Sequence, residues 1–231
     1  MTEVTRIAAF VSHYPGHAVL RELLGMPAIL RVVLVATDDP ESPCCNTPAR
    51  IWRYGWDEGL RRLVPRLSAE AGLEAFTGPV RCEGGSFHDR FAAARPDAII
   101  AMVFGQRIPG HLLDLVGRRA WNVHPVVPGR PLAATGGPEP YESAYRLGAG
   151  SAQLCVHRMT GAFDDGEEVA RSEPFPLPPI TSPGAELMLE LQRRTAPLAA
   201  ALVRSVLTGR FDHRPKAQQP LPAIFEERNS P

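Results

Sequence analysis

The chain has almost no lysine and no excess of charge of either sign. Its 25 basic residues are balanced by 25 acidic residues, the formal net charge is zero, and Lys216 is the only lysine. Proteins that bind nucleic acid through its phosphates usually carry a basic excess, which is missing here. We therefore expect no nucleic-acid partner, and we attribute the preference for arginine over lysine to genome composition.

Long apolar runs are also missing. No run approaches the roughly 18 residues that can span a bilayer. Residues 1–6 lack the basic stretch, apolar core and cleavage site of a signal peptide. We expect a cytoplasmic protein with no membrane partner.

Cysteine is scarce, and its spacing does not suggest a metal site. The four cysteines are Cys44, Cys45, Cys82 and Cys155, and no two of them form a C-x-x-C pair. A zinc site built from them and a histidine would lack the usual ligand spacing. We expect reduced thiols and no bound metal.

The pattern of apolar segments predicts an α/β fold. Residues 6–11 and 31–36 are short apolar strands, separated by a loop at 12–17 and a helix that starts near residue 18. Residues 97–104 are apolar on both faces, as in a central parallel strand. We expect a Rossmann-like, mostly parallel sheet flanked by helices, with a catalytic domain at 1–209 and a tail at 210–231.

The remaining elements are predicted from periodicity and from helix-start and helix-stop residues. Residues 125–140 form a long loop rich in Pro and Gly, and such loops are often functional. The last helix is expected to begin at Pro183, capped by Ser182, and to end at Gly209. The other expected elements are helices at 58–71, 86–95, 107–116 and 141–148, a strand at 119–123, and two strands at 152–159 and 167–171 for which antiparallel pairing is the expectation.

Two polar side chains lie near the end of the strand at 119–123. Asn122 and His124 are two residues apart, so both side chains point to the same face of a strand. The carboxyl edge of a parallel sheet is where ligands bind, and Pro125 is expected to end the strand there. Alone, this pair is a weak signal, and so are the two aspartates before Gly166, which also suit an ordinary turn.

Other candidate residues have a simpler structural interpretation. His13 and His17 are expected in a solvent-exposed loop, although contact with a substrate stays open. His157 alternates with core residues and is interpreted as a structural histidine, and Arg130 could hold a phosphate or carboxylate. The alternating aromatic residues are expected to pack under a loop rather than stack on a ligand; they are Trp52, Tyr54 and Trp56.

Four short motifs in order resemble the formyltransferase family. They are RPDAII at 95–100, GQRIP at 105–109, WNVHP at 121–125 and FDDG at 163–166. The family, which includes methionyl-tRNA formyltransferase and glycinamide ribonucleotide formyltransferase, has a buried strand after Pro-Asp, a GQ-x-L/I-P turn, N-x-H and D-x-G in that order. The resemblance is clearest over residues 95–171.

The resemblance implies a catalytic set and a formyl donor. By motif, the catalytic residues are Asn122, His124 and Asp164; Asp164 is preferred to Asp165 because it precedes the glycine by two. The donor, 10-formyltetrahydrofolate, would contact Gln106, Ile108 and the backbone near Phe163. An amine would attack the formyl carbon directly, with Asn122 stabilising the oxyanion, His124 donating or moving a proton, and Asp164 orienting His124.

Departures from the family pattern point to an unusual acceptor. HPVVP at 124–128 replaces H-x-S-L-L-P, and the loop at 129–140 would shape the acceptor pocket. Residues 12–17 lack a Gly-Asn-Gly-Ser-like phosphate cradle, which argues against glycinamide ribonucleotide. About 20 residues follow the last helix, too few for the domain that binds transfer RNA.

The expected acceptor is therefore a small-molecule amine: an amino sugar nucleotide, an amino acid or a natural-product intermediate. Two alternatives stay open, a hydrolase of 10-formyltetrahydrofolate and a non-catalytic module that binds folate or a partner. Deformylases usually carry an extra N-terminal regulatory domain, which this sequence does not show. The oligomeric state, including a homodimer, is also open.

Overall fold

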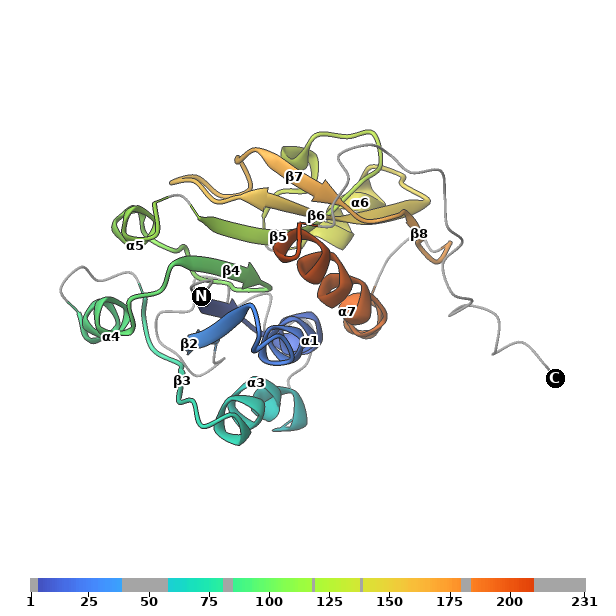
Figure 1. Ribbon diagram of the computed structural model, residues 1–231. Helices are drawn as coiled ribbons and strands as arrows, with labels where there is room; N and C mark the ends of the chain where they lie inside the picture. The colour runs from blue at the N-terminus through green and yellow to red at the C-terminus, as the bar shows by residue number, and fades with distance from the viewer. Residues whose placement is uncertain are drawn as a thin grey trace.

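A mixed sheet runs through the centre of the protein. The structure, a computed structural model, describes residues 4–38, 58–80, 85–117, 119–137, 139–179 and 184–209. Within these ranges eight strands form one sheet in the order β3-β2-β1-β4-β5-β6-β7, with β8 paired to β6 (Figure 1). The strands from β3 to β5 are parallel, and β6 and β7 are antiparallel to their neighbours. The predicted Rossmann-like, mostly parallel fold is confirmed.

The strand and helix bounds follow the predicted segments closely in most places. The strands are β1 (Thr5–Val11), β2 (Leu30–Ala36), β3 (Ala75–Phe76), β4 (Ala98–Met102), β5 (Ala120–Val126), β6 (Ser151–Arg158), β7 (Glu168–Arg171) and β8 (Phe175–Pro176). The helices are α1 (His13–Leu24), α3 (Glu58–Glu70), α4 (Ser86–Ala94), α5 (Gly110–Leu115), the short 3-10 helix η1 (Leu132–Thr135), α6 (Pro140–Arg146) and α7 (Ala185–Leu207).

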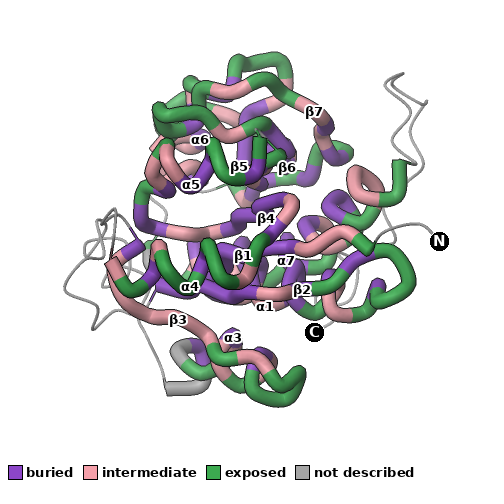
Figure 2. Tube along the Cα trace, turned by 60° about the vertical axis from the view of Figure 1, so that its left-hand side comes forward, coloured by how far each residue is buried: buried purple, intermediate pink, exposed green. Residues whose placement is uncertain are grey.

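Alternation along the strands creates one apolar core on each face of the sheet. In β1, Ile7, Ala9 and Val11 face the core formed with α1 and α7. The residues between them, Ala8 and Phe10, face the core formed with α4 and α5. Figure 2 shows the central strands buried and the outer sides of α3 and α4 exposed. Every side chain of β1 from Ile7 onward is therefore apolar, because both faces of this strand are covered.

Helix α1 begins five residues earlier than predicted. It starts at His13 and includes Pro15 and Gly16, which the sequence placed in a loop. Proline is compatible with the first turn of a helix because the N–H groups there have no intrahelical partner. Gly16 lies so close to the sheet that a Cβ atom would be 3.0 Å from the carbonyl carbon of Val11 and 3.1 Å from the carbonyl oxygen of Met102.

Two other features differ from the prediction, and a third lies partly outside the described residues. Pro125 lies inside β5, which continues to Val126; β4 pairs with β5 only as far as Val123, so a missing N–H is tolerated beyond that point. The segment expected as a long loop also contains η1. Helix α7 begins at Ala185 with Gly184 as its N-cap, and the predicted start at Ser182 and Pro183 lies outside the described residues.

Helix α7 returns along α1 and covers the same face of the sheet (Figure 1). Its predicted apolar stripe is confirmed, since Leu191 and Leu202 are buried and Leu187, Leu198 and Val206 pack against the same core. Among the helices that the structure describes, none combines the length and apolarity that crossing a membrane requires.

We predict that Gly16→Ala destabilises the protein by about 1–3 kcal/mol, because the added methyl group must push α1 away from the sheet. Gly110→Ala is the matched control: this glycine is also helical, and a Cβ atom there would meet nothing within 4 Å. Urea unfolding of the two variants measures the difference. Equal stability of the two variants would show that the close approach of α1 to the sheet is unimportant.

Candidate active site

Asn122 and His124 lie on the same face of the sheet as α4 and α5, beyond the part of that face that these two helices cover. Ala120, two residues earlier, belongs to the core under those helices, whereas Val123 belongs to the opposite core. Asn122 is therefore on the same face as Ala120 and His124, as the two-residue spacing predicted. Asn122 pairs with Ala101 of β4 and with His157 of β6, so it lies between two strands.

His157 of β6 completes this polar group, which the sequence did not predict, and its interpretation as a structural histidine stays a prediction. It is 2% exposed, and its ring lies 6.5 Å from that of His124 between centroids. Its Nε2 atom lies 3.2 Å from Nδ2 of Asn122. The sequence signal that could have found it is its spacing. His157 lies two residues after Cys155, on the same face of β6, and these two residues pair with Asn122 and His124 of β5.

Asp164 reaches the two histidines from the loop between β6 and β7. Its backbone is left-handed, with φ 47°, a conformation that aspartate tolerates better than most residues. Thr160 closes a turn in this loop by bonding to both the N–H and the carbonyl of Ala162. Arg107, in the GQRIP turn, donates a hydrogen bond to the carbonyl of Gly161. The turn before α5 and the Asp164 loop are thus fastened together.

Gly166 lets this loop close against β6. A Cβ atom at this position would overlap the carbonyl of Arg158. Glycine is therefore required by the close approach of two backbones. The spacing of two residues between Asp164 and Gly166 fixes how the carboxylate is presented, whereas Asp165 is exposed.

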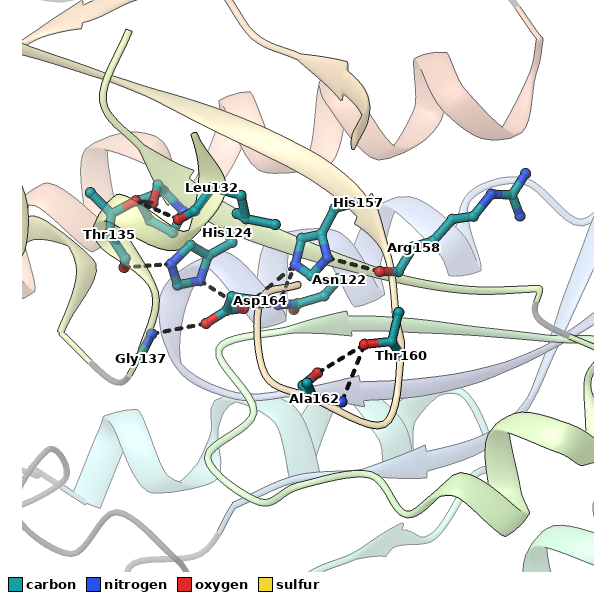
Figure 3. A network of polar contacts seen from close by, with 11 residues as sticks. Asn122, His124, Leu132, Thr135, Gly137, His157, Arg158, Thr160, Ala162 and Asp164 are labelled. Carbon is teal, nitrogen blue, oxygen red and sulfur yellow. Dashed lines mark hydrogen bonds and ion pairs between the residues drawn. The ribbon is translucent and has the colours of Figure 1, made fainter. Parts of the chain in front are cut away.

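The Asp164 carboxylate is the centre of the site (Figure 3). Its Oδ1 atom lies 3.5 Å from Nδ1 of His124, 3.5 Å from Nε2 of His157 and 3.3 Å from Nδ2 of Asn122. Its Oδ2 atom accepts a hydrogen bond from the N–H of Gly137 at 2.9 Å. Burial penalises the charged form, but the contact with His157, the His124 charge and the Gly137 N–H outweigh it and lower the pKa of Asp164 to about 2.

Backbone carbonyls fix one nitrogen of each histidine. Nε2 of His124 lies 2.8 Å from the carbonyl oxygen of Thr135, and Nδ1 of His157 lies 2.9 Å from that of Arg158. A carbonyl oxygen can only accept, so both of these nitrogens carry a hydrogen. The other nitrogen of each ring faces Asp164, where a second proton on either ring would meet a negative charge.

The amide of Asn122 has a defined orientation. Nδ2 faces His157 and Asp164. The flipped amide would place its oxygen against the carboxylate of Asp164, which is repulsive. Both amide hydrogens are directed at these two partners, so Asn122 must exchange one of these bonds before it can donate to a ligand.

The three residues predicted to contact the donor lie in different environments. Gln106 is 3% exposed: its amide oxygen accepts from the N–H of Val80, and its nitrogen donates to Asp38 and to the carbonyl of Gly78. Ile108 is buried in the core under α5. Phe163 is 60% exposed next to Asp164. Only Phe163 presents its side chain outward, and all three assignments stay predictions.

Other sequence-predicted residues lie apart from the polar group. His13 was expected in solvent, but it is buried in the first turn of α1, with Nδ1 3.0 Å from Oε1 of Gln192 on α7. His17 is partly buried in the same helix. The carbonyl of Arg130 accepts from Arg171, and Cys155 is buried as a free thiol. Cys44, Cys45, Cys82, Trp52, Tyr54 and Trp56 lie outside the described residues.

Backbone strain gathers near the carboxyl edge of the central strands. Of the four described non-glycine residues with positive φ, three lie here: His13 after β1, Val103 after β4, and Asp164; the fourth, Arg95, is the C-cap of α4. Such conformations cost on the order of 1–3 kcal/mol each and often mark functional positions. Among the residues that the structure describes, no group of three or more His, Cys, Asp or Glu side chains could hold a metal ion.

The match to a family model indicates an enzyme of one-carbon transfer. Residues 77–185, which carry all four motifs from RPDAII to FDDG, match the model of the formyl transferase family. This match confirms the resemblance noted in the sequence. No curated protein sequence matches the chain.

Solved structures share the fold at low sequence identity. Glycinamide ribonucleotide transformylase 1 from Symbiobacterium toebii is 19% identical with a TM-score of 0.61, and the match covers 91% of each chain. Phosphoribosylglycinamide formyltransferase from Streptococcus pneumoniae TIGR4 is 14% identical with a TM-score of 0.55, covering 87% of this chain and 99% of that one.

A formyltetrahydrofolate deformylase from Pseudomonas syringae pv. tomato str. DC3000 is 15% identical, with a TM-score of 0.60. The match covers 90% of this chain and 63% of the deformylase chain. Transferases and a hydrolase therefore share this fold, and the fold alone does not choose between the two reactions.

We predict that Gly166→Ala displaces the Asp164 loop, because its new methyl group cannot occupy the position of the Arg158 carbonyl. Gly161→Ala, in the same loop, is the control, since its nearest neighbour would be a nitrogen of Arg107 at an ordinary 3.8 Å. Amide exchange at residues 158–166 should accelerate in Gly166→Ala only. Acceleration in neither variant would mean that the loop accommodates a side chain at 166.

We predict that Asp164 makes stability depend on pH in the acid range. Its pKa is lowered from an ordinary 3.8 to about 2. Its contribution is therefore present above about pH 4 and is lost as the pH falls through about 2. Between pH 5 and pH 2 the wild type should lose roughly 2 kcal/mol that Asp164→Asn does not lose.

The exposed neighbour gives the control. Asp165→Asn should follow the wild type in urea unfolding across the same pH range. If Asp165→Asn removed the pH dependence and Asp164→Asn kept it, the ionised group at the centre of the site would be misassigned.

Proposed function

We propose that the protein is an N-formyltransferase that moves the formyl group of 10-formyltetrahydrofolate to the amine of a small molecule. The observation that supports this most is the ionised carboxylate of Asp164, held against His124, His157 and Asn122 on one face of the sheet. A buried anion next to imidazole rings can stabilise an imidazolium, which formyl transfer needs when charge develops on the formyl oxygen.

Each residue of this group has a role in direct transfer. The amine attacks the formyl carbon, and a tetrahedral oxyanion forms. His124, charged next to Asp164, donates to the oxyanion or takes part in moving the amine proton to the departing nitrogen. Asn122 exchanges its 3.3 Å bond to Asp164, the longer of its two, for a bond to the oxyanion. Such donors are typically worth about 3–4 kcal/mol.

The donor side of the site is assigned to the surface around Phe163. This side chain is exposed beside Asp164, and an exposed aromatic ring is suited to pack on the flat ring systems of a folate. Gln106 and Ile108 contribute indirectly, because their side chains fix the turn before α5 from within the protein. The backbone of this turn and of the Asp164 loop then remains for polar contacts with the donor.

The acceptor proposed is a small amine: an amino sugar nucleotide, an amino acid or a natural-product intermediate. The net charge of zero does not suit a nucleic acid. Residues 13–17 are the first turns of α1 rather than a glycine-rich loop. This difference argues against glycinamide ribonucleotide as the acceptor, although structures of enzymes named for it share the fold.

Hydrolysis of 10-formyltetrahydrofolate is the second candidate, because a formyltetrahydrofolate deformylase has the same fold. Water would then replace the amine at the formyl carbon. A third candidate is a module that binds folate without turnover. The presence of Asn122, His124 and Asp164 together argues against this third candidate. Donor consumption separates the three: a transferase needs an amine, a hydrolase needs only water, and a binding module consumes none.

We predict that His124→Ala abolishes donor consumption while donor binding is largely kept, because this ring acts on the reacting atoms rather than on the rest of the donor. Asp164→Asn should be similarly damaging, and Asp165→Asn should be mild because its side chain is exposed. Donor absorbance, followed with and without a panel of amines, measures all three.

Consumption that is unchanged in His124→Ala would remove this residue from the reaction. Loss of activity in Asp165→Asn but not in Asp164→Asn would mean that the wrong aspartate of the pair is assigned. Consumption of donor by wild type without any amine would replace the transferase by the hydrolase.

A further inference from the structure

Thr135 contacts the backbone and the ring of His124 at the same time. Its carbonyl oxygen lies 2.8 Å from Nε2 of His124. Its hydroxyl donates to the carbonyl of Pro125, the residue that follows His124 in β5, at 2.9 Å. Thr135 is 1% exposed, so neither bond is shared with solvent. The hydroxyl thus holds the carbonyl of Thr135 in place relative to the strand that carries His124.

The two histidines differ in the protonation state that their contacts favour. For His124, Nε2 faces a carbonyl and Nδ1 faces a carboxylate, and both of these partners accept hydrogen bonds. For His157, Nδ1 faces a carbonyl, and Nε2 lies 3.5 Å from Oδ1 of Asp164 but closer, at 3.2 Å, to the amide nitrogen of Asn122, which donates. A ring between two acceptors is best satisfied when both nitrogens are protonated, whereas a ring whose nearest partners are an acceptor and a donor is best satisfied when neutral.

We propose that Thr135 is a positioning residue that places the proton of the site on His124 and keeps His157 neutral. The carbonyl of Thr135 stabilises the His124 imidazolium from one side, and Asp164 stabilises it from the other. His157 then accepts from Asn122 and holds the amide turned toward Asp164. Thr135 acts through His124 and does not need to touch either substrate.

The charged and titratable groups around His124 agree with this assignment. Asp164 comes from the loop between β6 and β7, and His157 and Cys155 come from β6. Burial raises the pKa of the Cys155 thiol to about 12, so it is neutral beside the ring. Glu168 of β7 is paired with Arg171 at 2.6 Å. Asp164 is therefore the anion in direct contact with His124 in these surroundings.

One short segment, residues 135–137, contacts both His124 and Asp164. Thr135 binds His124, and the N–H of Gly137, two residues later, binds Asp164. The segment that follows the shortened HPVVP motif therefore sets the relative position of acid and counter-ion. The proposal deepens the formyl transfer proposed above and rests on it for its catalytic meaning, whereas the location of the proton is measured without substrate.

The test is nuclear magnetic resonance of ring nitrogens in the ¹⁵N-histidine-labelled protein. At neutral pH the wild type should show both nitrogens of His124 protonated and His157 neutral with its hydrogen on Nδ1. Thr135→Val removes the hydroxyl at nearly constant volume and should lower the midpoint of the His124 titration by roughly one pH unit. Thr135→Ser keeps the hydroxyl and should restore the wild-type midpoint.

Thr195→Val is the matched control. Thr195 is also buried, and its hydroxyl also donates to a backbone carbonyl, that of Leu191 at 2.8 Å, but it lies on α7. This variant should lose stability without moving the His124 titration. In turnover, Thr135→Val should lower kcat about tenfold with little change in KM for the donor, and Thr135→Ser should recover it.

The proposal is overturned if the wild type carries the proton on His157, a result that needs no variant to fold. An unchanged His124 titration in Thr135→Val overturns it as well. Either result together with normal formyl transfer would reject the role of Thr135 and leave the proposed function intact. The expected titrations in a protein that transfers no formyl group would reject the function and leave the positioning role intact.

Discussion

A buried negative charge controls the organisation of this site. Asp164 remains ionised although it is almost fully removed from water, and a charge in that position is tolerated only when polar partners surround it. Its partners come from β5, from β6 and from the segment after η1. These three parts of the chain cannot separate without exposing an uncompensated carboxylate to an apolar environment.

The fold supplies this arrangement by simple alternation. Residues of β5 and β6 alternate between the core under α1 and α7 and the opposite face, where α4 and α5 cover only the first strands of the sheet. The polar side chains occupy the uncovered part, and loops rather than helices close over them. Two hydrogen bonds fasten these loops, one from Arg107 to Gly161 and one from Thr135 to Pro125.

Much of this could be predicted from the sequence because strand alternation is local. The pair Asn122 and His124 and the antiparallel strands after them follow from a two-residue period, and all are found as expected. The proximity of Asp164 to His124 depends on a loop that joins different strands, and only the family resemblance pointed to it. His157 was interpreted as structural because a buried histidine in an apolar strand gives the same pattern whether or not it contacts Asn122.

Other features could not be predicted because they depend on backbone contacts between distant segments. The early start of α1 reflects the fit of Gly16 against β4, and the continuation of β5 through Pro125 reflects pairing that is limited to β6. The GQRIP motif marked a donor contact, yet the amide of Gln106 is bound to Asp38, Gly78 and Val80 within the protein. A motif of this kind identifies the turn but not which of its atoms face the ligand.

We propose that this polar group lies at the reacting end of a folate donor site. Calorimetric titration with 5-formyltetrahydrofolate, a stable mimic of the donor, tests it most directly. We expect saturable binding to wild type that weakens in Phe163→Ser and persists in Leu115→Ser, a control that removes an apolar side chain of similar exposure from α5. Absence of binding at high ligand concentration, with and without candidate amines, would contradict the proposal that the donor is a folate. It would not affect the fold or the match to the family model.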